Sequence, residues 1–248
     1  MKGVVLCAGY AKRMWPLTLE TPKPLLPVGE KPIVEYILER LRDIEEIKDV
    51  VISTNLRFED KFKEWLTYLR FPKPIRLLIE ETREEKKKLG SVGSLNFIIN
   101  KAEIDEDSLV IGGDNLFDFD LRNLISFFKE KKKTCLLLYD MKDKDRVKKK
   151  YGVLELDNTG RIIEFQEKPE EPNSTLISTA CYLFTRDDLR LIKRYLEEGN
   201  SPDQMGFFIS WLKDRSRIYG LKFEGSWFDI GSFEEYDRAK EAYGKGLV

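Results

Sequence analysis

The chain has 248 residues, enough to bury a hydrophobic core as one large domain or as two small lobes. Its hydrophobic share of 42% is that of an ordinary globular protein, and its net charge of −1 gives no general attraction to nucleic acid or to an anionic membrane. No apolar stretch reaches the roughly 18 residues that a membrane-spanning helix needs, and the first residues do not resemble a secretory leader. We therefore expect a globular protein with no nucleic-acid partner and no membrane partner.

Two kinds of residue narrow the chemistry. The chain has no histidine, which excludes Ser-His and Cys-His mechanisms and most zinc sites, so any chemistry must use carboxylates, lysines, arginines or a hard cation. Cys7, Cys135 and Cys181 lie far apart in apolar runs without a metal-binding spacing, which indicates buried thiols and a reducing, cytoplasmic setting. Charged residues make up 35% of the chain and glutamine occurs only at positions 166 and 204, a pattern typical of a thermophile.

The first half of the chain alternates short apolar runs with amphipathic helical stretches. We expect strands over 4–6, 49–53, 75–79, 108–112 and 134–139, and helices over 33–44, 58–70, 91–101 and 121–132. Strands that alternate with helices of about 10 to 15 residues indicate a mostly parallel α/β sheet, in which ligands bind at the carboxyl ends of the strands. The turns that follow Leu6 and Ile111 both lie at such ends.

The second half has a different pattern, with more antiparallel character. We expect a hairpin over 152–165, strands over 177–184 and 217–222, and helices over 187–198, 203–213 and 233–242. Ser232 and Glu235 have the spacing of a capping box at the start of the last helix. We predict a single domain over residues 1–248, with a nucleotide-type α/β lobe over 1–133 and a second lobe over 134–248.

The first 32 residues carry the clearest functional pattern. The apolar run Val4–Leu6 stops at the small residues of Ala8–Ala11, which let the backbone turn tightly and approach a ligand closely. Two cations, Lys12 and Arg13, follow at once, and Lys23 sits between two prolines. Backbone N–H groups and fixed cations both bind phosphate, so this stretch predicts an anion site, which we interpret as the triphosphate cradle of a nucleotide-using enzyme. The spacing is not that of a Walker A motif.

The segments Leu6–Thr18 and Lys23–Val28 closely resemble the signature of the sugar-1-phosphate nucleotidylyltransferases. This family includes glucose-1-phosphate thymidylyltransferase, glucose-1-phosphate uridylyltransferase and mannose-1-phosphate guanylyltransferase. Further segments resemble family motifs in family order: Gly90–Leu95 for the nucleobase, Gly113–Asn115 for a metal carboxylate, Tyr151–Val153 and Glu167–Pro169 for the sugar phosphate, and Trp227–Gly231 for a second metal carboxylate. The resemblance therefore covers nearly the whole chain.

The resemblance implies both a fold and a reaction. The fold is α/β, a three-layer sandwich with a mostly parallel, Rossmann-like central sheet of the nucleotide-diphospho-sugar transferase type and a smaller antiparallel sugar-binding part. In the reaction, the phosphate oxygen of a sugar 1-phosphate attacks the α-phosphate of a nucleoside triphosphate, giving a nucleotide-sugar and pyrophosphate. The attacking oxygen is already anionic, so no general base is needed, and the main task is to neutralise charge.

The resemblance also assigns roles to residues of this chain. Arg13, which would bridge the triphosphate and the departing pyrophosphate, and Lys23, at the α-phosphate, are expected to be catalytic. The expected nucleotide-binding residues are Leu6, Ala8, Gly9, Lys12, Arg13, Lys23 and Gly90. The expected sugar-phosphate-binding residues are Tyr151, Gly152, Glu167, Lys168, Thr179 and Trp227, and Mg²⁺ is expected to be held by Asp114 and Asp229 together with the phosphates.

The chain departs from the family pattern at three positions. Lys12 stands where the family commonly has threonine, and it either contacts the β- and γ-phosphates or points outward. Ser178 and Ala180 stand where the family often shows Asn-x-Gly. It is therefore open how the chain recognises the hydroxyl groups of the sugar, and alanine in place of glycine leaves less room near the sugar ring. These positions leave the identity of the sugar undecided.

An Asp-x-Asp motif, Asp118-Phe119-Asp120, suggests a different class of enzyme. This motif holds the metal in many glycosyltransferases that use nucleotide-sugars, but here it directly precedes the helix expected from Leu121. Carboxylates at a helix N-terminus act as caps, so we interpret both aspartates as part of the helix start.

Several alternatives stay open at this point. Family frequency alone favours dTTP or UTP as donor and glucose 1-phosphate as acceptor, with GTP:mannose-1-phosphate or CTP-dependent transfer as the alternative. The rivals from other classes are a glycosyltransferase and a non-catalytic nucleotide-sugar sensor. We expect no appended β-helix or acyltransferase domain, and the protein is either a monomer or a homodimer.

Overall fold

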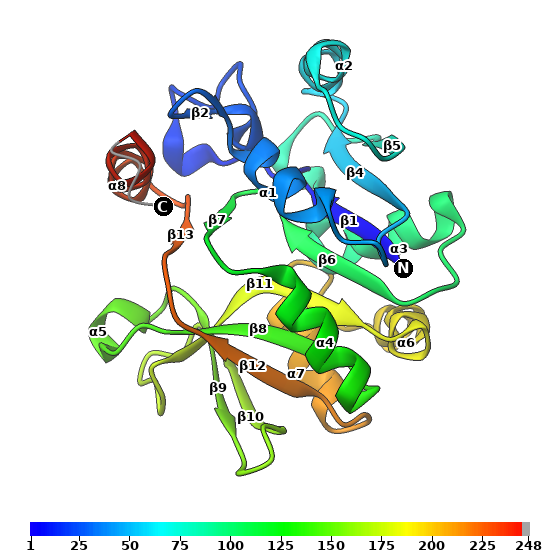
Figure 1. Cartoon of the computed structure of the whole chain (residues 1–248), viewed down its shortest axis with the longest axis vertical. Coiled ribbons are helices and arrows are strands. Elements are labelled where there is room, and N and C mark those ends of the chain that lie inside the picture. Colours follow the sequence, from blue (N-terminus) through cyan, green and yellow to red (C-terminus); the bar gives the residue numbers. More distant parts are fainter. Residues whose placement is uncertain (245–248) are drawn as a thin grey trace.

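A nine-stranded mixed sheet runs through the computed structural model, which describes residues 1–244 (Figure 1). The strand order is β10-β9-β11-β6-β1-β4-β5, with β8 beside β11 and β12 beside β8. The strands are β1 (Lys2–Leu6), β4 (Asp49–Asn55), β5 (Ile75–Glu80), β6 (Ser108–Gly112), β8 (Cys135–Asp140), β9 (Gly152–Leu156), β10 (Ile162–Glu167), β11 (Leu176–Phe184) and β12 (Tyr219–Phe223).

The strands of the first half form the parallel part of the sheet. β1 lies between β4 and β6 and is parallel to both, and β4 is parallel to β5. β11 is antiparallel to β6 on one side and to β8 on the other, so one sheet joins the two halves of the chain. The expected α/β fold with a mostly parallel central sheet is confirmed.

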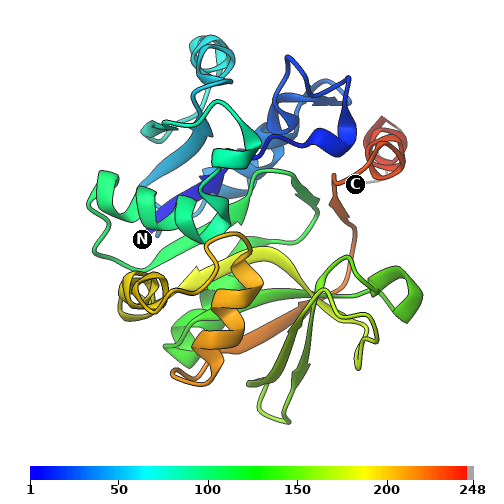
Figure 2. The same ribbon diagram turned by 180° about the vertical axis from the view of Figure 1, so that it is seen from behind.

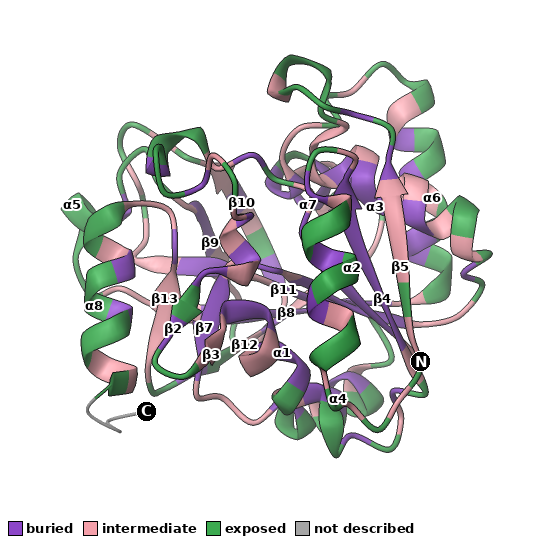
Figure 3. Ribbon diagram, turned by 90° about the horizontal axis from the view of Figure 1, so that it is seen from above, coloured by how far each residue is buried: buried purple, intermediate pink, exposed green. Residues whose placement is uncertain are grey.

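Helices cover both faces of the sheet, which makes three layers (Figures 1 and 2). One face is covered by α1 (Ile33–Arg42), α2 (Glu59–Tyr68) and α4 (Leu121–Lys131), and the other by α3 (Gly90–Ala102), α6 (Arg186–Glu197) and α7 (Met205–Lys213). Neighbouring residues of one strand serve opposite faces: Val5 packs under α1, whereas Val4 packs under α3. Two-sided burial explains why the strands are apolar runs. Figure 3 shows these buried strands between helices whose outer faces are exposed.

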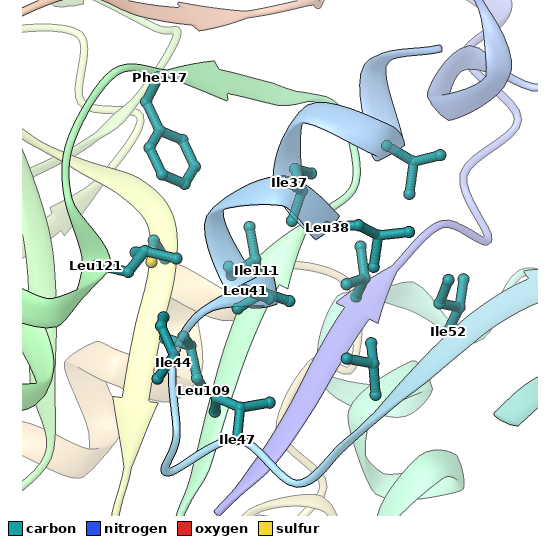
Figure 4. Close-up of a cluster of buried hydrophobic side chains, with 14 of the residues drawn as sticks. Ile37, Leu38, Leu41, Ile44, Ile47, Ile52, Leu109, Ile111, Phe117 and Leu121 are labelled. Atoms are coloured by element: carbon teal, nitrogen blue, oxygen red, sulfur yellow. The ribbon is translucent and has the colours of Figure 1, made fainter. Parts of the chain in front are cut away.

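Helix α1 shows how the apolar stripe builds one layer. Its Ile37, Leu38 and Leu41 are buried and pack against strand residues such as Ile52 and Leu109 (Figure 4). The spacing i, i+1, i+4 places these side chains on one face of a helix. Truncating one of them to alanine removes about 2 to 5 kcal/mol of stability, so the periodic positions hold this layer together.

The sequence did not predict the shortest elements. These are β2 (Pro27–Val28), β3 (Lys31–Pro32), β7 (Asn115–Phe117), β13 (Trp227–Asp229) and α5 (Lys144–Val147). Three-residue strands are too short to show a period, although β7 and β13 pair with each other in an antiparallel ribbon. The last helix, α8 (Phe233–Gly244), follows that ribbon, and Ser232 accepts a hydrogen bond from the Glu235 backbone as expected of a cap. Within residues 1–244, the helices are too short or too polar to cross a bilayer.

Candidate active site

The loop after β1 presents a row of free backbone donors. The backbone N–H groups of residues 8–13 donate no hydrogen bond to any part of the chain that the structure describes, whereas Met14 N–H donates to the Ala11 carbonyl. Ala11 takes a left-handed φ of 46°, and the Thr18 hydroxyl fixes its carbonyl at 2.8 Å. Because these N–H groups have no partner within the described chain, they are available to bind the acceptors of an anionic ligand.

Residues 9–13 of this loop line a cavity of about 270 Å³, and Lys23 lines it as well. Lys23 begins a short helical turn, Lys23–Leu25, and its ammonium lies 2.5 Å from the Asp114 carboxylate. Lys12 lies 2.9 Å from the Glu85 carboxylate and 5.5 Å from the centre of the Trp15 ring. Three cations and a row of N–H groups around one cavity make a site for a polyanion.

The β7–β13 ribbon places a second carboxylate, Asp229, next to Asp114, which lines this cavity. Its register pairs Asp229 with Asn115, and Ile230 N–H donates to the Asp114 carbonyl at 3.1 Å, so Asp114 and Asp229 are neighbours. Burial raises the pKa of Asp229, and the nearby charge of Asp114 raises it further, while Lys23 and Arg13 oppose the rise. Two adjacent carboxylates that repel each other fit a hard divalent cation.

The rest of such a cation's ligands would have to come from elsewhere. In the described part of the chain, no three His, Cys, Asp or Glu side chains gather into a metal-binding group. Mg²⁺ is commonly held by one or two carboxylates plus substrate phosphates, and Asp114 and Asp229 fit that pattern.

A second cavity, of about 380 Å³, shares Asp114 with the first. Tyr151 and Trp227 form an aromatic wall with ring centres 5.4 Å apart in an edge-to-face arrangement. The Trp227 indole N–H donates to the Asn115 side-chain oxygen at 2.9 Å, which ties the wall to the carboxylate ribbon. An aromatic wall beside polar groups suits the apolar face of a sugar ring.

Glu167 and Lys168 form the polar wall of this cavity. The Lys168 ammonium donates to the Gln204 amide oxygen at 2.7 Å and lies 3.5 Å from the Glu167 carboxylate. Burial raises the pKa of Glu167, and Lys168 opposes that rise. Gly152 leaves room for the Phe165 ring and the Glu167 carboxylate, since a Cβ there would lie 2.6 Å from the ring and 3.1 Å from a carboxylate oxygen. This wall therefore offers a cation, Lys168, and a carboxylate, Glu167, to a polar anionic ligand.

Every site residue expected from the sequence lines one of these two cavities, although their roles remain predictions. The larger cavity is lined by Ala8, Gly90, Tyr151, Gly152, Glu167, Lys168, Thr179, Trp227 and Asp229, the smaller one by Lys12, Arg13 and Lys23, and both by Leu6, Gly9 and Asp114. Gly90 lines the wall in a left-handed conformation with φ of 76°. The amides that follow it are used within the fold, because Ser91 N–H and Val92 N–H donate to the Asp203 and Pro202 carbonyls.

The sequence analysis missed several lining residues. Lys88 lines both cavities and lies 3.0 Å from the Asp203 carboxylate. Glu80, the last residue of β5, is 1% exposed and accepts a hydrogen bond from the Ser94 hydroxyl. Burial raises the pKa of Glu80 to about 7. The rule that ligands bind at the carboxyl ends of parallel strands could have found Glu80.

The Asp-x-Asp motif lines neither cavity. Asp120 accepts a hydrogen bond from Arg122 N–H at 2.9 Å as the cap of α4, so the cap interpretation is right for this residue. It is wrong for Asp118, whose carboxylate instead accepts from Ser226 N–H at 2.9 Å and so anchors the segment that leads into β13.

The two family departures on β11 lie at an irregularity of that strand. Ala180 lines the larger cavity with a left-handed φ of 54°, where the register between β11 and β8 shifts. The Ser178 hydroxyl lies 3.4 Å from the Tyr182 hydroxyl. Alanine therefore keeps the backbone shape that favours glycine and adds a methyl group to the cavity wall.

Known proteins are similar to this chain over nearly its full length. The nucleotidyl transferase family model matches residues 2–246. The chain is 29% identical over 231 residues to the bifunctional protein GlmU of Methanocaldococcus jannaschii, covering 93% of this chain and 51% of that protein. It is 30% identical over 246 residues to the D-glycero-alpha-D-manno-heptose 1-phosphate guanylyltransferase of Campylobacter jejuni, covering 95% and 97%.

A solved structure is also similar to this chain, in both fold and sequence. A protein from Bacillus anthracis, described as a glucose-1-phosphate thymidylyltransferase and solved in complex with sucrose, superposes with a TM-score of 0.85 at 26% identity, covering 98% of this chain and 95% of that one. The chain spans about half the length of the GlmU relatives it matches.

Proposed function

We propose a function from one premise: this chain belongs to the nucleotidyl transferase family. The proposed reaction transfers a nucleotidyl group from a nucleoside triphosphate to a sugar 1-phosphate and releases pyrophosphate. The partners are therefore two small anionic substrates.

The observation that carries this proposal is the row of free N–H groups over residues 8–13, set between Arg13, Lys23 and the Asp114–Asp229 pair. A triphosphate supplies acceptors for such a row, and its charge needs cations and a metal. The second cavity, with Lys168 and the Tyr151–Trp227 wall, adjoins the same carboxylates and has the groups that a sugar 1-phosphate needs.

In the proposed mechanism, a phosphate oxygen of the sugar 1-phosphate forms a bond to the α-phosphorus while the bond from that phosphorus to the bridging oxygen of pyrophosphate breaks. Arg13 and the free N–H groups hold the pyrophosphate as it gains charge, and Lys23 holds the α-phosphate. Lys168 orients the attacking phosphate. Asp114 and Asp229 would hold the cation, proposed to be Mg²⁺, which supplies further positive charge at the phosphates.

The finer choice of substrates remains a prediction. Family frequency favours dTTP or UTP with glucose 1-phosphate, and the name of the Bacillus anthracis protein supports thymidine. The Campylobacter relative is instead named for a guanylyl group and a heptose 1-phosphate, in line with the GTP alternative. These two names indicate different nucleobases, so the base that this chain binds has to be inferred from its own residues.

We also propose a cellular location and a kind of source organism for the protein. Three buried cysteines without a disulfide among the described residues support a reducing, cytoplasmic location. The Lys/Glu-rich composition supports a thermophilic source.

Pyrophosphate release tests the function. With Mg²⁺, a triphosphate and a sugar 1-phosphate, we expect release that falls about 100-fold when Arg13 is changed to alanine, because one transition-state charge contact is lost. Asp118→Ala is the matched comparison, since a glycosyltransferase would depend on Asp118 and not on Arg13. No pyrophosphate release, together with glycosyl transfer from a nucleotide-sugar that Asp118→Ala abolishes and Arg13→Ala does not, would contradict the proposal and favour that rival.

A further inference from the structure

Glu80 is a buried carboxylate in the wall of the larger cavity, and the proposed mechanism gives it no role. It is 1% exposed, and it lines the cavity together with Leu6, Ala8, Gly9 and Ser94. The Ser94 hydroxyl donates to one of its oxygens. Within residues 1–244, no lysine or arginine forms an ion pair with it. The Ser53 hydroxyl is a second neighbour of this carboxylate. A buried carboxylate without a cation is costly, and its two oxygens can accept more hydrogen bonds than these two hydroxyls supply.

The sheet places Glu80 at the opposite end of the site from the sugar-binding groups. Glu80 ends β5, the edge strand beyond β4, whereas Gly152 and Glu167 lie on β9 and β10 at the other edge. The phosphate-binding loop follows β1, which lies between these edges. If the loop holds the triphosphate and β9–β10 hold the sugar phosphate, the part of the nucleotide left for the β5 side is the base.

We infer that Glu80 reads the nucleobase and selects guanine, so that GTP is the donor. This inference rests on the proposed function and replaces the preference for dTTP or UTP that came from family frequency. It makes Glu80 a specificity-determining residue and leaves the chemistry of transfer unchanged.

The chemistry of the base edges supports guanine. An ionised carboxylate is an acceptor at both oxygens. Guanine presents two donors side by side, N1–H and the 2-amino group, which match those oxygens. Uracil and thymine present one N–H between two carbonyl oxygens, so the second carboxylate oxygen would face another acceptor. Adenine and cytosine present one amino group beside a ring nitrogen acceptor. Only guanine satisfies both oxygens, and hydrogen bonds to a charged acceptor are among the strong ones.

The test compares donors at pH 8 by pyrophosphate release. For the natural protein we expect kcat/KM for GTP to exceed that for UTP and dTTP by about 100-fold, as a bidentate contact allows. ITP, which lacks the 2-amino group, should fall about 10-fold below GTP because one charge-assisted hydrogen bond is lost. A preference for UTP or dTTP, or equal rates for GTP and ITP, would overturn the inference without touching the proposed function.

Glu80→Gln gives the second arm. Its amide offers one acceptor and one donor, which fits the N3–H and O4 of uracil, so the GTP-to-UTP ratio should fall at least about 10-fold. Glu81→Gln, a change at the exposed neighbour, should leave the ratio unchanged. An unchanged ratio in a folded Glu80→Gln protein would overturn the inference.

A binding measurement separates the two proposals. If no triphosphate gives pyrophosphate, the proposed function fails, and calorimetric titration of the natural protein with GTP, ITP and UTP still tests base reading. Tighter binding of GTP than of ITP by about 10-fold would support Glu80 as the reader, and equal binding of all three would refute it.

Discussion

Replacing Glu80 with glutamine should stabilise the protein at pH 8 and change little near pH 5. Burial raises the pKa of Glu80 from 4.5 to about 7, so the folded state holds a proton that the unfolded state releases at lower pH. Below 4.5 both states are protonated, and the stability contribution is fully present. It is lost as the pH rises through about 7, because the folded state must then hold an ionised carboxylate.

The magnitude follows from the gap between the two pKa values. At 1.36 kcal/mol per pH unit, a gap from 4.5 to about 7 corresponds to about 3 kcal/mol. Glutamine keeps an oxygen that can accept the Ser94 hydroxyl and has no charge to desolvate. The free energy of unfolding of Glu80→Gln should therefore exceed that of the natural protein by about 3 kcal/mol at pH 8.

Urea unfolding between pH 5 and 8.5 measures this difference. Glu81→Gln is the matched control, since its exposed side chain has little to lose on ionisation. The difference between Glu80→Gln and the natural protein should grow with pH, while that of the control stays flat. A difference that is constant across this range would refute the reasoning, because it would show that Glu80 ionises equally well in both states.

Three further changes have defined outcomes. Ala11→Gly should raise the free energy of unfolding by about 1 kcal/mol in urea, because φ at this position is 46°; a loss of stability would contradict the backbone strain. Asp120→Ala should lower it by about 1 kcal/mol by removing the cap of α4, and an unchanged midpoint would count against the cap. Lys12→Thr should raise the KM for the triphosphate modestly in steady-state kinetics; an unchanged KM would limit Lys12 to its ion pair with Glu85.

The local pattern of apolar residues in the sequence was enough to predict the longer strands and helices. Strand β1 is a continuous apolar run and helix α1 has a clear apolar period, and the packing of both agrees with these local patterns. The loop after β1 could be interpreted as an anion site because small residues and cations stand next to each other in the chain.

The parts that were missed depend on contacts between distant segments. The β7–β13 ribbon pairs residues more than 100 positions apart over three residues each, so neither strand shows a period. Gln204 reaches Lys168 from the loop before α7. Glu80 stands in a run of charged residues that resembles a solvated surface, and only the sheet shows that its side chain is buried.

The central claim is that the N-terminal loop binds a triphosphate for transfer to a sugar phosphate. The most direct measurement is pyrophosphate release by the natural protein with Mg²⁺ across a panel of nucleoside triphosphates and sugar 1-phosphates, repeated with Arg13→Ala. The account predicts release that requires both substrates and falls about 100-fold in the variant. Release that is unaffected by Arg13→Ala, or no release from any pair of substrates, would contradict it.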